Sequence, residues 1–151
     1  MPEESLEFSV NAQLALVYAK RQAEKLNSLF ICSTHMLVGI IEVGEGTAYE
    51  CFRSLEVNRV RLMRQLVTIH PEECAPKAHQ SGLYSVEAKQ ALFRGSQESR
   101  RAHDSLIRTI HLLLGILDTD TAQAKPLLHQ EGLSVEKVRR YLSTLYDEEG
   151  D

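Results

Sequence analysis

Two histidines occupy matching places in this sequence and are the side chains best suited to proton transfer or metal binding. His35 and His111 each fall in the first turn of an expected helix, in the similar strings STHMLVGI (33–40) and TIHLLLGI (109–116). A zinc-binding helix of the H-E-x-x-H type carries a second histidine four positions on, but here that position is glycine both times. We therefore expect each imidazole to hydrogen-bond the backbone near its helix start and to set the packing between helices.

A second group of metal-capable side chains is His70, Cys74 and His79, in a stretch that also holds two prolines and a glycine. Their spacing matches no zinc signature, and no fourth ligand is defined, so we expect no metal. The chain has no G-x-x-x-x-G-K-[ST] string to hold nucleotide phosphates. It also lacks a nucleophile, base and orienting group at an interpretable spacing. We expect no catalytic residue and no cofactor, and therefore not an enzyme.

The three cysteines are few, odd in number and widely spaced, with no C-x-x-C pair. This pattern predicts reduced thiols and not a disulfide framework. Cys51 lies on an apolar helical face with Phe52 and Leu55, where a free cysteine packs as a small hydrophobic residue. Cys32 lies just before a helix N-terminus, which lowers the pKa of a thiol, and this suggests the hypothesis of a redox-sensitive residue.

The elements that must position these side chains occur twice along the chain. Shifting the sequence by 76 positions aligns residues 8–66 with 84–142 without a gap and brings His35 onto His111 and Gly39 onto Gly115. Apolar residues recur at spacings of three and four, and alternating patterns are missing, which favours helices throughout. We expect an all-α fold of two tandem four-helix repeats, packed with approximate two-fold symmetry as one domain.

The expected organisation is a single domain over 1–151, in which the two repeats are joined by a Pro-containing connector and followed by an acidic tail. Ser9 is expected to cap the opening helix, Ser33 or Thr34 the second, and Asn58 to precede the fourth. The boundaries are repeat one at about 8–69, connector at about 70–83, repeat two at about 84–146 and tail at 147–151. In repeat two we expect helices over about 85–102, 109–117, 122–130 and 134–145.

Composition and charge exclude several classes of protein. The chain has 151 residues, 43% of them hydrophobic, with a formal net charge of −4. It lacks the broad basic field of a nucleic-acid-binding protein. It also has no apolar run near the roughly 20 residues that span a membrane. The acidic N-terminus does not resemble a secretory signal. We expect a cytoplasmic protein, or one of an organelle stroma if a transit peptide has been removed, with no nucleic-acid or membrane partner.

The repeated strings at 33–40 and 109–116, the first followed by EVGEG at 42–46, resemble the Clp repeat. That repeat forms the N-terminal domain of ClpC- and ClpA-type AAA+ unfoldases, where each copy carries Gly-Thr-Glu-His, then Leu-Leu-Gly-Leu and Gly-Glu-Gly. The pairs Phe8-Ser9 and Tyr84-Ser85 are similar to the Phe-Thr that opens each family repeat. The resemblance covers nearly the whole chain.

The resemblance implies a non-catalytic protein-interaction module that docks adaptors or substrates for a Clp-type ATP-dependent unfoldase or protease, or modulates that machine. Such a module exists either as a free-standing protein or as the N-terminal part of a full-length unfoldase. Its expected partners are a Clp ATPase, adaptor proteins or substrate proteins. An alternative hypothesis is a small-molecule or stress sensor with its ligand in the groove between the repeats.

The resemblance also indicates where docking occurs, and where this chain departs from the family. In the ClpC branch the glutamate of each Gly-Thr-Glu-His helps to recognise phosphorylated arginine, whereas Thr34 and Ile110 stand there in this chain. Threonine offers one hydroxyl and isoleucine none, in place of a carboxylate that can pair with a guanidinium. The pattern therefore does not predict phosphoarginine recognition. The docking residues implied by position are Ser33, Thr34, Glu42, Glu45, Thr109 and Ile110.

Charged and apolar edges could contribute to docking as well. The second repeat has a basic edge and the first an acidic one; such runs are usually solvated helix faces, and otherwise steer partners of opposite charge. The basic edge comprises Arg94, Arg100, Arg101 and Arg108, and the acidic edge Glu42, Glu45, Glu50 and Glu56. Leu29, Phe30 and Leu106 are the expected apolar anchors.

Overall fold

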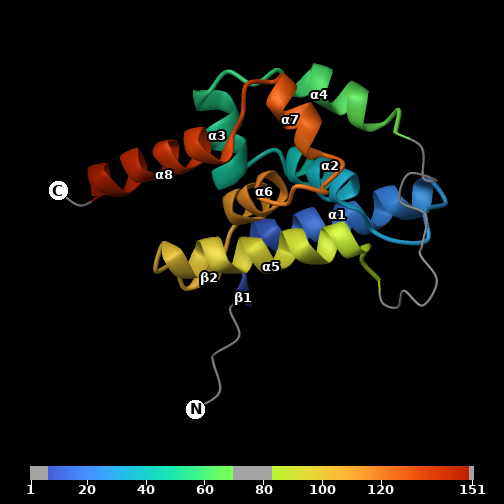
Figure 1. Cartoon of the computed structure of the whole chain (residues 1–151), viewed down its shortest axis with the longest axis horizontal. Coiled ribbons are helices and arrows are strands. Elements are labelled where there is room, and N and C mark those ends of the chain that lie inside the picture. The colour runs from blue at the N-terminus through green and yellow to red at the C-terminus, as the bar shows by residue number, and fades with distance from the viewer. Residues whose placement is uncertain (1–6, 70–82, 150–151) are drawn as a thin grey trace, which may run out of the picture.

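The structure is a computed structural model that describes residues 7–69 and 83–149. Its helices confirm the all-α prediction, with four in each repeat of the described chain (Figure 1). The first repeat contains α1 (Val10–Lys25), α2 (Ser33–Val43), α3 (Thr47–Ser54) and α4 (Arg59–Leu66). The second contains α5 (Val86–Arg101), α6 (Thr109–Leu117), α7 (Lys125–Gln130) and α8 (Val135–Glu149).

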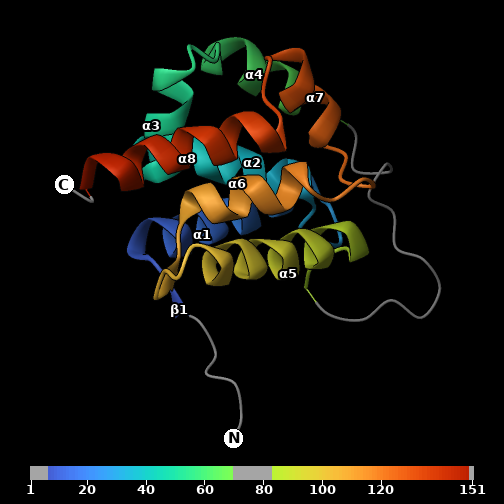
Figure 2. The same ribbon diagram turned by 60° about the vertical axis from the view of Figure 1, so that its left-hand side comes forward.

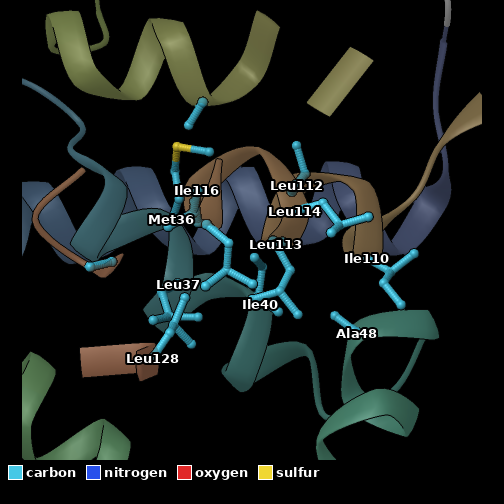
Figure 3. Packing of buried hydrophobic residues seen from close by; sticks show 14 of the residues in the cluster. Met36, Leu37, Ile40, Ala48, Ile110, Leu112, Leu113, Leu114, Ile116 and Leu128 are labelled. Carbon is cyan, nitrogen blue, oxygen red and sulfur yellow. The ribbon is translucent and has the colours of Figure 1, made fainter. Parts of the chain in front are cut away.

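The helices form three layers, with the two most apolar helices in the middle. Helices α2 and α6 lie between α1 and α5 on one side and the remaining helices on the other (Figure 2). Every residue of α6 is buried, as is every residue from 33 to 40 of α2. A helix that is apolar on all sides has to lie inside a fold. The central core is therefore built from both repeats, including Met36, Leu37, Ile40, Leu113 and Ile116 (Figure 3).

Glycine permits each central helix to approach the long helix of its own repeat very closely. A Cβ at Gly39 would lie 2.0 Å from the carbonyl oxygen of Ala15, and a Cβ at Gly115 would lie 2.0 Å from that of Ala91. Both pairs obey the offset of 76 residues. The small residues thus fix the same helix–helix geometry in both repeats, and with it the position of each helix start.

The opening segment of each repeat pairs with the other repeat. Strand β1 (Glu7–Phe8) lies parallel to β2 (Leu106–Ile107), and at the related place Ile31 bridges Tyr84. The sequence does not predict these pairs, because two-residue pairs are too short to produce an alternating pattern. The exchange of segments gives the expected approximate two-fold symmetry.

Most helix boundaries follow the sequence prediction, with three differences. Ser9, Asn58 and Ser85 each accept the backbone N–H of a residue in the first turn, as N-caps do. The N-cap of α2 is Cys32, not Ser33 or Thr34. Helix α7 begins at Lys125 and not near 122. Helix α8 runs to Glu149, so the first part of the expected tail is helical.

Candidate protein-docking surface

A carboxylate from the second repeat holds the N-terminus of α2. Glu87 accepts the backbone N–H of Ser33 at 2.8 Å, and the hydroxyl groups of Ser33 and Ser85 also donate to it. The backbone N–H of Gln123 donates to the same carboxylate at 3.1 Å, and that of Ala124 donates to Ser33 Oγ at 3.3 Å. A negative charge at a helix N-terminus stabilises the unpaired amides there. We call this set the Glu87 clasp.

The N-terminus of α6 is held by neutral groups at the symmetry-related place. The backbone N–H of Ile110 donates to Thr47 Oγ1 at 3.1 Å, and the backbone N–H of Ala48 donates to Thr109 Oγ1 at 3.0 Å. The two hydroxyl oxygens are 3.3 Å apart. Asn11 stands at the position that corresponds to Glu87. We call this set the Thr47 clasp; it joins the repeats without any charge.

The six residues expected to dock partners divide into two groups. Glu42 and Glu45 are exposed at the end of α2. The other four are buried, with exposed fractions between 0 and 3%; they are Ser33, Thr34, Thr109 and Ile110. The structure thus brings Ser33 and Thr109 into the two clasps and leaves only the glutamates in direct contact with solvent.

The two histidines also face inward. The backbone N–H of Cys32 donates to His35 Nδ1 at 2.9 Å, and that of Arg108 donates to His111 Nδ1 at 2.9 Å. Burial lowers the pKa of both imidazoles, so each is neutral and carries its proton on Nε2. This confirms the expected structural role at the helix starts.

The outer surfaces of α1 and α5 carry large apolar side chains that nothing in the described chain covers. Val10 and Val86 are 73% and 51% exposed, and Val17 and Phe93 are 47% and 61% exposed. Each pair obeys the offset of 76 residues. Figure 2 shows α1 and α5 side by side on the outside of the molecule, away from α8. We call the exposed set Val10, Leu14, Val17, Val86 and Phe93 the apolar face.

A shallow pocket lies beside the apolar face, where the segment before α5 meets α1. It has a volume of about 280 Å³. Apolar side chains make up most of its wall, and Gln13 and Lys20 stand at its polar edge. The apolar residues are Leu16, Val17, Ile31, Leu83 and Tyr84. The pocket extends the apolar face across the junction of the two repeats.

Comparison with known proteins assigns the chain to a family. A family model described as the Clp repeat (R) N-terminal domain matches residues 7–82 and again residues 83–149. This chain belongs to the Clp repeat N-terminal domain family. The match to two consecutive copies agrees with the internal repeat and with the two-fold arrangement of the helices.

Relatives of this Clp N-terminal domain are much longer proteins. It is 26% identical over 140 residues to the negative regulator of genetic competence ClpC/MecB of Bacillus subtilis, and 27% identical over 138 residues to the chaperone protein ClpB of Oceanobacillus iheyensis. Each alignment covers 91% of this chain. The chain spans 17% of the length of either relative.

Solved structures confirm the fold. The N-terminal domain of the chaperone ClpD from Arabidopsis thaliana superposes with a TM-score of 0.69 at 15% identity, covering 95% of this chain and 99% of that one. The Hsp104 N-terminal domain from Candida albicans gives a TM-score of 0.68 at 20% identity, covering 89% and 87% of the two chains. At these identities the likeness is one of fold alone.

The cysteines of this Clp N-terminal domain differ from the prediction of three reduced thiols. Cys51 is free and buried as expected, and burial raises the pKa of its thiol to about 12. Cys32, in contrast, is disulfide-bonded. The spacing of cysteines in the sequence does not report which of them meet in space. The prediction of a reduced thiol is therefore wrong for Cys32, while its redox sensitivity stays a prediction.

Three further sequence predictions concern a metal site, a membrane span and a ligand groove. In the described residues no group of three or more His, Cys, Asp or Glu is placed to hold a metal ion, and His70, Cys74 and His79 lie outside those residues. No helix among them has the length and apolar character required to cross a membrane. The groove between the repeats as a ligand site stays a prediction.

Ion pairs partly neutralise the predicted basic edge of the second repeat. Arg94 pairs with Asp118 at 3.2 Å, and Arg108 pairs with Asp104 at 2.7 Å. Of the expected apolar anchors, Leu29 is 75% exposed, while Phe30 and Leu106 are half-buried. Sequence reasoning missed the apolar face, although a signal existed: alanines at 12, 15, 19 and 23 mark the buried stripe of α1 and leave its valines outside.

Proposed function

We propose that this Clp N-terminal domain is a non-catalytic protein-interaction module that docks adaptors or substrates for, or modulates, a Clp-type ATP-dependent unfoldase or protease. The observation that carries the proposal is the apolar face. Its large apolar side chains are exposed at related positions of α1 and α5, and Val17 continues into the apolar wall of the adjoining pocket. Exposed apolar surface of this kind is typical of a protein-binding site. The membership of the family and the names of its longer relatives support the same role.

The partner that fits the apolar face is a polypeptide segment with exposed apolar side chains, as an unfolded substrate presents. Phe93 is the largest side chain of the face, and aromatic residues commonly supply the central contacts of an interface. Burying each valine or phenylalanine contributes roughly 1.5–3 kcal/mol when its whole side chain leaves water. Because Val17 and Phe93 are already partly covered in the folded chain, the gain per residue is at the lower end.

The residues implied by the family resemblance have distinct roles in this proposal. Glu42 and Glu45 contact basic groups of a partner at the acidic edge, where charge affects the rate of association more than the affinity. Ser33, Thr34, Thr109 and Ile110 act through the packing of α2 and α6, because their side chains are buried. Variants of these four residues should alter docking only together with stability.

The test is a titration of the isotope-labelled 151-residue chain with reduced, carboxymethylated α-lactalbumin, a permanently unfolded protein, monitored by NMR. We expect chemical-shift changes concentrated on α1 and α5. The double variant Val17→Ser/Phe93→Ser should weaken binding at least tenfold, because it removes two apolar contacts that are related by the two-fold symmetry.

The matched control is Val60→Ser, since Val60 is 70% exposed on α4, away from the apolar face. It should bind as the unmodified chain does. Shift changes that avoid α1 and α5, or equal binding by the double variant, would overturn the proposal. Thermal melting of every variant separates loss of docking from loss of folding.

A further inference from the structure

An ion pair closes the junction between the two repeats on one side of the symmetry axis. Arg61, on α4, donates to both carboxylate oxygens of Glu131 at 2.7 and 2.9 Å. The backbone N–H of Asn58 donates to the same carboxylate at 3.3 Å. Glu131 follows α7, and its side chain is only 3% exposed. The fold thus contains a built site in which a glutamate inserts beside an arginine.

The symmetry-related site lacks its glutamate. The offset of 76 residues relates Arg61 to Lys137 and Glu131 to Leu55. Leu55 and Glu131 are equivalent in the backbone as well, since each is the residue that ends a helix, α3 and α7 respectively. A leucine side chain cannot accept a hydrogen bond or pair with a cation. On this side of the axis the cation is retained and its carboxylate is absent.

A pocket of about 340 Å³ opens at that place. Lys137 and Arg140 supply two cations one helical turn apart on α8, and both are exposed. Leu55 and Tyr141 form its apolar wall. Glu131 also lines the pocket, and its carboxylate is held by Arg61. Within the described residues, neither Lys137 nor Arg140 belongs to an ion pair. Because the Glu131 carboxylate is already paired with Arg61, the two cations of α8 leave the pocket with an excess of positive charge beside its apolar wall.

We propose that this pocket binds a glutamate side chain from an acidic segment of a partner protein. The carboxylate lies beside Lys137 and Arg140 as that of Glu131 lies beside Arg61, and the aliphatic part of the side chain lies on Leu55. Charge complementarity and the internal example of Glu131 both indicate this occupant. The inference goes beyond the proposed function, because the pocket lies on α8, in the layer opposite α1 and α5 (Figure 2).

The test uses the labelled full chain and the peptide acetyl-(Ser-Glu-Gly)4-amide, with the corresponding glutamine peptide as a control. We expect shifts of Gly132, Lys137 and Arg140 with the glutamate peptide only, and weaker binding as salt is raised. The variant Lys137→Gln/Arg140→Gln should weaken binding at least fivefold. A control of equal charge, Lys25→Gln/Arg64→Gln, should not; Arg64 is the residue related by symmetry to Arg140.

A second variant supplies the missing carboxylate from within the chain. Leu55→Glu places a glutamate at the position equivalent to Glu131, and it should block the peptide while the thermal melt shows a folded protein. The variant Val17→Ser/Phe93→Ser should bind the acidic peptide normally, which separates failure here from failure of the proposed function. Equal binding of the glutamine peptide, or unchanged binding by the Lys137/Arg140 variant, would overturn the proposal. So would displacement of the peptide by an equal concentration of inorganic phosphate.

Discussion

The starts of α2 and α6 are related by symmetry but are stabilised by different chemistry. Both have a histidine that accepts the N–H of the residue before the helix at 2.9 Å. At α2 the remaining contacts come from the Glu87 carboxylate, whereas at α6 they come from the hydroxyl of Thr47. Both repeats therefore satisfy the first amides of their buried helix, but they do so with different residues.

A second pair of sites shows the same divergence. In repeat two, Glu98 is 6% exposed and is paired with Arg139, whose Nε lies 3.4 Å from Glu98 Oε2. The corresponding residues in repeat one are Gln22 and Met63, which carry no charge. Repeat two thus places charged groups where repeat one uses neutral ones. The two halves share a backbone plan and differ in electrostatics.

The largest expected effect would break the feature that the repeats share. Gly39→Ala and Gly115→Ala each place a Cβ 2.0 Å from a backbone carbonyl oxygen, so the packed helices must separate. We expect each to lower the free energy of unfolding by about 3 kcal/mol or more, at the upper end of overpacking effects. Urea unfolding followed by circular dichroism measures the loss.

Gly95→Ala provides a graded control for this effect. A Cβ at Gly95 would lie 2.9 Å from the carbonyl oxygen of His111, and repeat one has alanine at the corresponding position, Ala19. The loss should be clearly smaller, because alanine also favours the helix by about 1 kcal/mol over glycine. Unfolding free energies of Gly39→Ala and Gly115→Ala that match that of Gly95→Ala would contradict the close-packing argument.

The next effect concerns the two clasps. Glu87→Ala leaves several amides and hydroxyls at the start of α2 without an acceptor, and should cost about 2–3 kcal/mol because charge-assisted hydrogen bonds are lost. Thr47→Val removes one neutral acceptor from Ile110 N–H and should cost about 1 kcal/mol. The measurement is the urea midpoint of both variants. Equal losses of unfolding free energy would show that the charge of Glu87 adds nothing to stability.

Sequence reasoning predicted the repeat, the helices and the role of the histidines because each depends on local or repeated patterns. Apolar spacing reports a buried face, and the identical offset of His35 and His111 reports a shared structural role. The short strand pairs left no such pattern, since Phe8 and Ile107 meet only after the repeats have packed. Contacts between distant segments depend on tertiary geometry.

The candidate docking surface was harder to predict from the sequence, because it too depends on contacts between distant segments. Glu87 looks like an ordinary acidic residue in the first turn of a helix, and only the fold brings it to Ser33. The apolar face was hidden because Val10 and Val17 belong to an apolar run that also contains the buried alanines. The family resemblance located Glu42 and Glu45 on the surface but gave no burial for Thr34 or Ile110.

The smallest expected effect is the contribution of the two buried histidines to the pH dependence of stability. Burial lowers the pKa of both, so the unfolded chain binds protons first as pH falls below 6.5, and stability decreases on acidification. His35→Asn or His111→Asn should keep an acceptor for the backbone N–H and reduce the slope of unfolding free energy between pH 7.5 and 5.5.

The pKa values of the two histidines also test the difference between the clasps. The Glu87 carboxylate opposes the effect of burial on the pKa of His35, whereas Asp104 and Glu98 oppose it at His111 and Arg108 reinforces it. Glu87→Ala should therefore lower the pKa of His35 further and leave that of His111 unchanged. NMR titration of the imidazole resonances in the folded variant measures both values. An equal shift at the two histidines would mean that Glu87 acts through the whole fold, and not through its charge at the start of α2.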